Sequence, residues 1–196
     1  MRRYVRIAAS AAVAAVVATG AVATGSGVAF ASPAAAPNSV AAADKQWEHT
    51  AELVEFRTSD NKGTFYTLNK EEAAKAESEH GFRPTGEAAG IRLFTKKVPG
   101  SIPVHRLKRL DVTFHTYIVS SNKKEIEDLT GERRPGLKFK DEGVLGFVLV
   151  EQEAGTMPLY RYAKDTVWRL ARDNRVDLLA AGYKKSEGTI GFVPVG

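Results

Sequence analysis

Short stretches in which apolar and polar residues alternate recur along this chain of 196 residues, and each leads into a stretch with helical spacing. Alternation over a few residues is typical of a strand with one buried face, and apolar residues three or four positions apart are typical of an amphipathic helix. The recurring order is strand, strand, helix and strand, and it begins near Leu53, Val104 and Leu159. We therefore predict an α+β fold class.

The three predicted helices share a start signal, an asparagine followed three positions later by an acidic residue. The asparagines are Asn69, Asn122 and Asn174. Such an asparagine accepts a hydrogen bond from an unpaired backbone amide, and the acid reaches back to the cap or favours the N-terminal end of the helix. A glycine ends each helix. In the third helix we expect a buried face made of Val176, Leu179 and Ala180.

Each unit closes with a glycine near the start of an apolar strand, at Gly90, Gly146 and Gly191. The units span about 51–102, 103–157 and 158–196, a period of about fifty residues that is typical of repeat arrays and closed rings. One strand–strand–helix–strand unit cannot bury its apolar face alone, so we expect three repeats that share one core. Closure with pseudo-threefold symmetry would leave no unpaired strand edge, and an open stack is the alternative.

The N-terminal residues have the pattern of a secretory signal peptide. An alanine-rich apolar run follows three arginines, Arg2, Arg3 and Arg6. Cleavage is expected after Ala31, which gives a signal peptide over 1–31, an Ala/Pro/Ser-rich linker over 32–46 and a single domain over 47–196. The apolar run is short and interrupted by glycine, so we expect no stable membrane anchor. The predicted localisation is secreted.

Charge and cysteine content narrow the function classes. The formal net charge of +5 falls by the three leader arginines to +2, which does not support a basic surface for nucleic acid. The chain has no cysteine, so its core alone must hold it without disulfides. Thiol catalysis and cysteine-ligated zinc are excluded.

Three stretches carry a resemblance to a known family. Pro-Leu-Tyr-Arg-Tyr at 158–162, Ala-Ala-Gly-Tyr at 180–183 and Glu-Gly-Thr-Ile-Gly-Phe-Val at 187–193 resemble the DUF5648 repeat domain. The resemblance is strongest in the third unit and weakest in the first. It implies an accessory binding role, because the family occurs in secreted proteins, alone or attached to hydrolases. A histidine of the family pattern is replaced by threonine here, at Thr64, Thr113 and Thr166.

No catalytic motif occurs in the sequence, and the histidines lack the short spacing of a metal site. We therefore expect neither a metal nor a cofactor. Two matched pairs recur instead, Arg106 with Arg161 and Glu142 with Glu187. Repeated pairs usually serve the repeated fold, so we expect them to form internal hydrogen-bond networks. An enzyme assembled from Glu142, Glu187, His105 and His115 is the weaker alternative.

Tyr66, His115 and Trp168 align in the second strand of the units. If the preceding residues face the core, these three face away from it. Exposed aromatic residues with polar tips are typical of sugar recognition and of protein interfaces, although this face could instead pack against a helix. We predict a secreted, monomeric, non-catalytic module that binds extracellular polysaccharide or peptidoglycan. The alternative is a module that binds or inhibits a secreted hydrolase.

Overall fold

The computed structural model describes residues 47–131, 136–172, 175–185 and 188–195. The predicted leader and linker lie outside these residues, as do Asn174 and Glu187. The elements are listed in chain order: β1 (Thr50–Glu52), β2 (Val54–Arg57), β3 (Thr64–Thr67), α2 (Lys70–His80), β4 (Arg83–Pro84), β5 (Arg92–Phe94), β6 (Ser101–Arg109), β7 (Tyr117–Ser120), α3 (Lys123–Thr130), β8 (Phe139–Leu149), β9 (Thr156–Lys164), β10 (Val167–Arg172), α4 (Val176–Ala180), β11 (Lys184–Lys185) and β12 (Gly191–Pro194). The α+β class is confirmed, and strands dominate.

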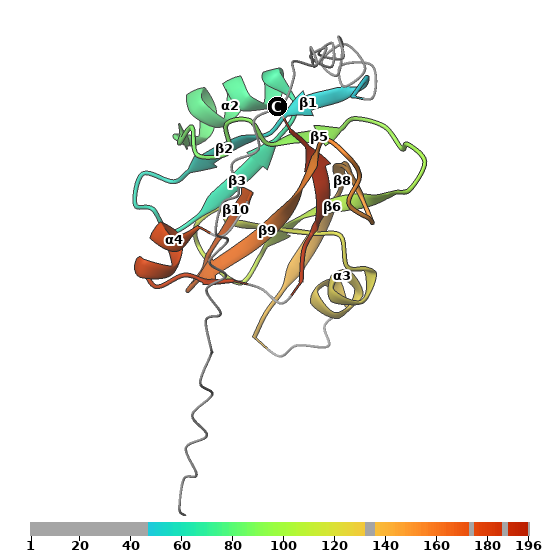
Figure 1. Cartoon of the computed structure of the whole chain (residues 1–196). Helices are drawn as coiled ribbons and strands as arrows, with labels where there is room; N and C mark the ends of the chain where they lie inside the picture. Colours follow the sequence, from blue (N-terminus) through green and yellow to red (C-terminus); the bar gives the residue numbers. More distant parts are fainter. Residues whose placement is uncertain (1–46, 132–135, 173–174, 186–187, 196) are drawn as a thin grey trace, which may run out of the picture. The chain divides into compact units, whose positions relative to one another are not determined.

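All strand pairs are antiparallel, within two sheets. The larger sheet follows the order β1-β5-β8-β12-β9-β10, with β6 on β8, β7 on β6 and β11 on β9. The smaller sheet has the order β3-β2-β4. Figure 1 shows the larger sheet curled, with α3 beside β8 and α2 beside β3.

The predicted capping asparagines are confirmed at the two helix starts whose asparagine the structure describes. Asn69 Oδ1 accepts hydrogen bonds from the amides of Glu71 and Glu72, and Asn122 Oδ1 accepts one from Glu125. The predicted buried face of the third helix is wrong. Val176 is 71% exposed and Leu179 42%, whereas Leu178 is buried. Since α4 has only five residues, it makes little more than one turn and presents one residue to the core.

One buried cluster draws residues from all three predicted units. The opening segments of the units contribute Leu53, which lies between β1 and β2, Val104 and Leu159, and the closing strands contribute Leu93, Val148 and Val193. These closing strands also contact one another in pairs. Phe94 pairs with Phe147, Leu149 with Phe192, and Ile91 forms a bridge with Val195.

Glycines allow this close approach of the closing strands. A Cβ atom on Gly146 would lie 3.0 Å from Leu93 Cβ and 3.1 Å from the Phe94 carbonyl oxygen. A Cβ atom on Gly191 would lie 2.3 Å from Val148 Cγ2. Gly90 instead has a φ of +75° and lies against the Arg172 guanidinium. The three glycines therefore have structural roles, although the role of Gly90 differs.

Candidate functional site

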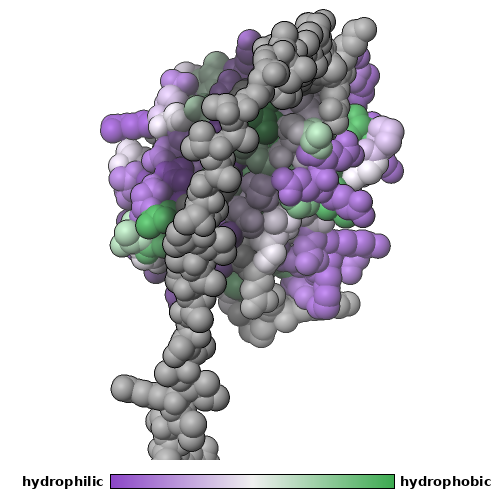
Figure 2. All heavy atoms as spheres, in the orientation of Figure 1, coloured by the Kyte–Doolittle hydropathy of each residue, from purple (hydrophilic) through white to green (hydrophobic). Residues whose placement is uncertain are grey.

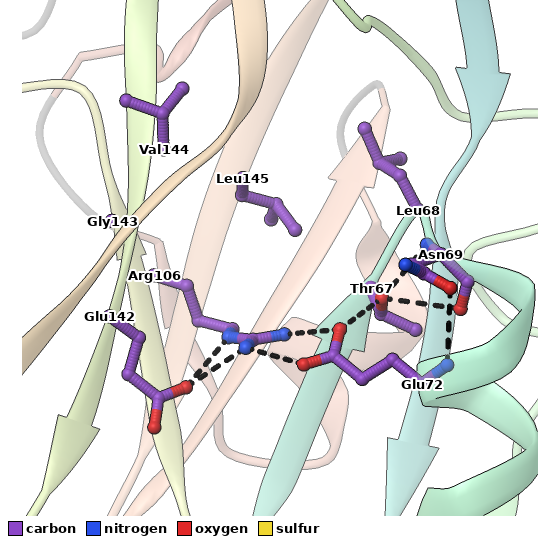
Figure 3. Close-up of a pocket in the computed structure, with 9 residues that line it drawn as sticks. All are labelled: Thr67, Leu68, Asn69, Glu72, Arg106, Glu142, Gly143, Val144 and Leu145. Carbon is purple, nitrogen blue, oxygen red and sulfur yellow. Dashed lines mark hydrogen bonds and ion pairs between the residues drawn. The ribbon is translucent and has the colours of Figure 1, made fainter.

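A groove between α2 and the neighbouring strands β6 and β8 is the best candidate site. It consists of two depressions, of about 160 Å³ and about 560 Å³, which share Glu72, Arg106 and Glu142. We call it the Arg106 groove. Figure 3 shows its smaller depression, where Arg106 reaches across from β6 and lies between Glu142 and Glu72. Phe65 and Tyr117 line the larger depression, and both side chains are largely buried.

Arg106 is held by every nitrogen of its guanidinium group. Nη1 and Nη2 donate to the two carboxylate oxygens of Glu72 at 2.9 and 2.7 Å, and Nη1 also donates to the Tyr66 carbonyl. Nε donates to Glu142 Oε2 at 3.0 Å. The guanidinium carbon lies 4.7 Å from the ring centre of Phe65. Such a two-pronged pair fixes both side chains, so this end of the groove is rigid.

Glu72 is ionised because of these contacts. Burial favours its neutral form, but hydrogen bonds from Arg106 and Thr67 outweigh burial and lower the pKa of Glu72. The expected capping role of the Glu72 carboxylate is wrong, because Thr67 takes it over. The amide of Asn69 donates to Thr67 Oγ1 at 2.9 Å, which leaves the Glu72 carboxylate free to hold Arg106.

Burial, with a smaller contribution from Glu142, raises the pKa of Tyr117 to about 12. The phenol therefore stays protonated at any physiological pH and remains a hydrogen-bond donor.

The two-pronged pair of an arginine and a glutamate, which we call the clasp, occurs again between α3 and β9. Arg161 donates to both carboxylate oxygens of Glu125 at 2.9 and 2.7 Å and to the carbonyl of Val119. Ser120 takes the place of Thr67: its hydroxyl donates to Glu125 and accepts from the backbone amide of Asn122, which takes the place of Asn69. Arg106 thus forms an internal network that includes Glu142, the expected acid, whereas Arg161 holds Glu125, an acid that the sequence analysis did not pair with it. The network of Glu187 lies outside the described residues.

The corresponding place in the first unit has the opposite charge. Glu55 is fully buried in β2, where it accepts hydrogen bonds from Tyr66, Thr85 and Arg169. Arg169 also pairs with Glu87 at 2.9 Å. The sequence analysis missed this cluster, because Glu55 stands between Val54 and Phe56 like an outward residue of an alternating strand. An arginine of β10 compensates its charge from a distant part of the chain.

The three residues predicted for binding do not form one exposed surface. Tyr66 is 1% exposed, and its hydroxyl bonds Glu55 and the backbone at Trp168 and Leu170. Burial and the charge of Glu55 raise the pKa of Tyr66. The expectation that Tyr66 faces away from the core is wrong, because β3 is buried on both faces.

His115 and Trp168 lie elsewhere. His115 is exposed in the loop before β7, with its ring 5.6 Å from that of His80. Trp168 is half-buried, and its ring lies 6.1 Å from Phe139. The residue that matches Tyr66 in register is Val119, because Tyr66 pairs with Glu55 as Val119 pairs with Arg106. The longer β6–β7 loop shifted the sequence alignment.

The residues of the enzyme alternative have separate partners. His105 Nδ1 lies 2.8 Å from Asp141 Oδ2, Glu142 holds Arg106, and His115 contacts the ring of His80. Among the described residues, no group of three or more histidines or acids is placed to hold a metal ion. Within the same residues, no helix is long and apolar enough to span a membrane.

Comparison with known proteins identifies the family. A family model described as a domain of unknown function, DUF5648, matches residues 52–193. The chain belongs to the DUF5648 family. The DUF5648 match includes the whole Arg106 groove, so the groove is part of the family domain. No curated protein and no solved structure matches the chain.

Proposed function

We propose that this DUF5648 protein is a non-catalytic module that binds glycans, and that the Arg106 groove is its binding site. The observation that supports this most is the fixed Arg106 guanidinium, held by Glu72 and Glu142 above the ring of Phe65. Sugar sites combine placed polar groups with aromatic surface. Groups that are already ordered lose little entropy when a ligand binds.

The polar groups of the groove suit sugar hydroxyls. Glu142 has a second carboxylate oxygen that can accept from a hydroxyl, and the protonated Tyr117 can donate to one. Figure 2 supports a polar recognition mode, since the visible described surface is mainly hydrophilic with small, separate apolar areas. A ligand rich in hydroxyl groups fits this surface better than an apolar ligand does.

The electrostatics of the groove favour binding over catalysis. A carboxyl group that acts as a general acid near neutral pH needs a raised pKa. Arg106 instead lowers the pKa of Glu72. Glu72 is therefore arranged as a fixed charge rather than a proton donor.

A protein-binding or inhibitor module is the second candidate. The observation that favours it is the exposure of Val176 and Leu179 on α4. Two exposed aliphatic residues one turn apart can contribute to the centre of a protein interface. This candidate places the site on α4, away from the residues that line the Arg106 groove, so the two proposals can be tested separately.

We also propose that the protein acts outside the cell as a monomer. The predicted leader over 1–31 supports export, which would bring the module to extracellular polysaccharide, peptidoglycan or a secreted protein. Mass spectrometry of the exported protein should find Ser32 as its first residue. An N-terminus at Met1 would contradict this.

We further propose that the three units are repeats closed around a pseudo-threefold axis. Support comes from the pairwise contacts of the closing strands and from the two-pronged bonds of Arg106 to Glu72 and of Arg161 to Glu125, which join the same atoms. A shared core cluster is expected for such closure.

A pull-down on insoluble peptidoglycan, chitin and cellulose tests the glycan proposal. We expect the purified protein to be retained on one of these polymers and the Glu142→Gln variant to be released. The matched control is Glu151→Gln, which makes the same change at an exposed position outside the groove. Release of both variants, or no retention of the parent on any polymer, would favour the protein-binding candidate.

A further inference from the structure

We infer that one end of the Arg106 groove binds the carboxylate of an acidic sugar. This end, which we call the basic end, is lined by Lys108, Lys140 and His80, and His115 lies beside it, against the ring of His80. The inference rests on the proposed glycan function and deepens it, because it gives the chemical class of the sugar. Its starting point is a pair of lysines that face each other without an acid between them.

Lys108 on β6 lies directly opposite Lys140 on β8, and both line the groove. On its other side Lys108 pairs with Tyr117 of β7. Side chains directly opposite each other in an antiparallel pair are close neighbours, and like charges at such positions are destabilising. Within the described part of the chain neither lysine forms an ion pair. An anion bound between them would relieve their repulsion.

Three of the four acids that line the groove have partners other than the two lysines. Glu72 and Glu142 hold Arg106, while Asp141 lies 2.8 Å from His105 Nδ1 and accepts from the amide of Gly143. Glu79 also lines the groove from α2, but it forms no ion pair with another described residue. The groove thus has a compensated end at Arg106, whereas Lys108, Lys140 and the single acid Glu79 have no ion-pair partner among the described residues.

Two histidines and a phenylalanine complete the basic end. The His115 ring lies 5.6 Å from that of His80 and 6.2 Å from that of Phe82. The exposed rings of the two histidines offer flat surface for a sugar beside the lysines. A carboxylate on the sugar ring would then lie near Lys108 and Lys140, while neighbouring hydroxyls reach Tyr117.

The pKa of His115 depends on the charges around the basic end. Burial lowers the pKa of His115, the positive charges of Lys108 and His80 lower it further, and Glu142 acts in the opposite direction. A bound anion would favour the charged imidazolium and raise this pKa. By linkage, binding of the anion should strengthen as the pH falls through the pKa of His115.

Calorimetric titration with a galacturonate oligomer tests the inference, with a galactose oligomer of equal length as the neutral counterpart. We expect the galacturonate oligomer to bind more tightly. The Lys108→Gln/Lys140→Gln variant should weaken its binding by about tenfold, as expected for the loss of two partly exposed charge contacts. The control variant Lys96→Gln/Lys97→Gln removes the same charge from an exposed loop and should bind like the parent. In the parent, NMR titration should find a higher His115 pKa in the complex.

The outcomes separate this inference from the proposed function. Equal binding of both oligomers, with no effect of the groove lysines, would overturn the acidic-sugar assignment and leave the glycan proposal standing. Dextran sulfate that competes equally well at equal charge would overturn the assignment to a carboxylate. A parent protein that binds no saccharide at all would overturn both.

Discussion

Arg106 is the residue on which the geometry of the groove depends. It joins helix α2, through Glu72, to strand β8, through Glu142, and its side chain is 13% exposed. Three charges lie close together, and the single cation keeps the two carboxylates near each other. Removal of the cation would leave two neighbouring acids without an ion-pair partner, which is more unfavourable than the loss of the whole network.

The Arg106→Met variant should therefore unfold more easily, by about 2 kcal/mol, since the site is only partly screened by solvent. Urea unfolding measures this change. The control is Lys97→Met, which also replaces a cation by methionine but at an exposed position, and it should change the unfolding free energy little. A change below about 0.5 kcal/mol for Arg106→Met would mean that the clasp does not stabilise the fold.

The pH dependence of stability should show the contribution of Glu72. Its pKa is lowered in the folded state from an ordinary value of 4.5, so its contribution is present above that value. The contribution is lost as the pH falls through the folded-state pKa. The difference in unfolding free energy between the parent and Glu72→Gln should thus shrink between pH 7 and pH 3. The exposed Glu71→Gln variant should show no comparable pH trend, and a constant difference for Glu72→Gln would contradict the ion pair.

Tyr66 should matter for stability and not for binding. Tyr66→Phe removes the hydroxyl that serves Glu55 and the backbone of β10, and leaves a buried carboxylate short of a donor. We expect a loss of about 2 kcal/mol in unfolding free energy. Retention on a polysaccharide that binds the parent should be unchanged. Loss of retention in a folded Tyr66→Phe protein would restore the original assignment of Tyr66 to a binding site.

At the scale of elements, the same contact between a helix and a later strand occurs twice. The clasp joins α2 to β6 and α3 to β9 with the same set of bonds. The start signals at Asn69 and Asn122 were predictable, because a capping bond is local and depends on spacing alone. The partner of the following acid was not predictable, because Arg106 comes from a strand more than thirty residues away.

The pairing register of the second strands could not be predicted from the local sequence pattern either. A loop of different length precedes β7, so alignment by local pattern matched Tyr66 to His115 rather than to Val119. The burial of Glu55 could not be predicted for a similar reason, since an alternating strand pattern places its side chain toward solvent. The long-range approach of Arg169 places a buried cation 3.0 Å from Glu55 and compensates its charge. The fold class and family were thus predictable, whereas the composition of the groove depended on contacts between units.

At the scale of the whole domain, the closing strands β5, β8 and β12 meet around the shared core. Alanine at Gly146 would crowd Leu93 and Phe94, and alanine at Gly191 would crowd Val148 more severely. We expect Gly146→Ala to destabilise the domain by about 1–3 kcal/mol and Gly191→Ala by more, because the added Cβ at Gly191 would lie closer to its neighbours, 2.3 Å from Val148 Cγ2 and 2.8 Å from the Leu149 carbonyl oxygen. Thermal unfolding measures both. Two variants as stable as the parent would contradict the close packing of the three strands.

The glycan proposal is tested most directly by mapping backbone amide shifts in NMR spectra of the purified protein. Soluble fragments of peptidoglycan, chitin and cellulose, together with a galacturonate oligomer, would be added separately. The account predicts that one of them shifts the amides of α2, β6 and β8 around Arg106, and leaves those of α4 unchanged. Shifts confined to other surfaces, or none with any of the saccharides, would contradict a glycan site in the Arg106 groove.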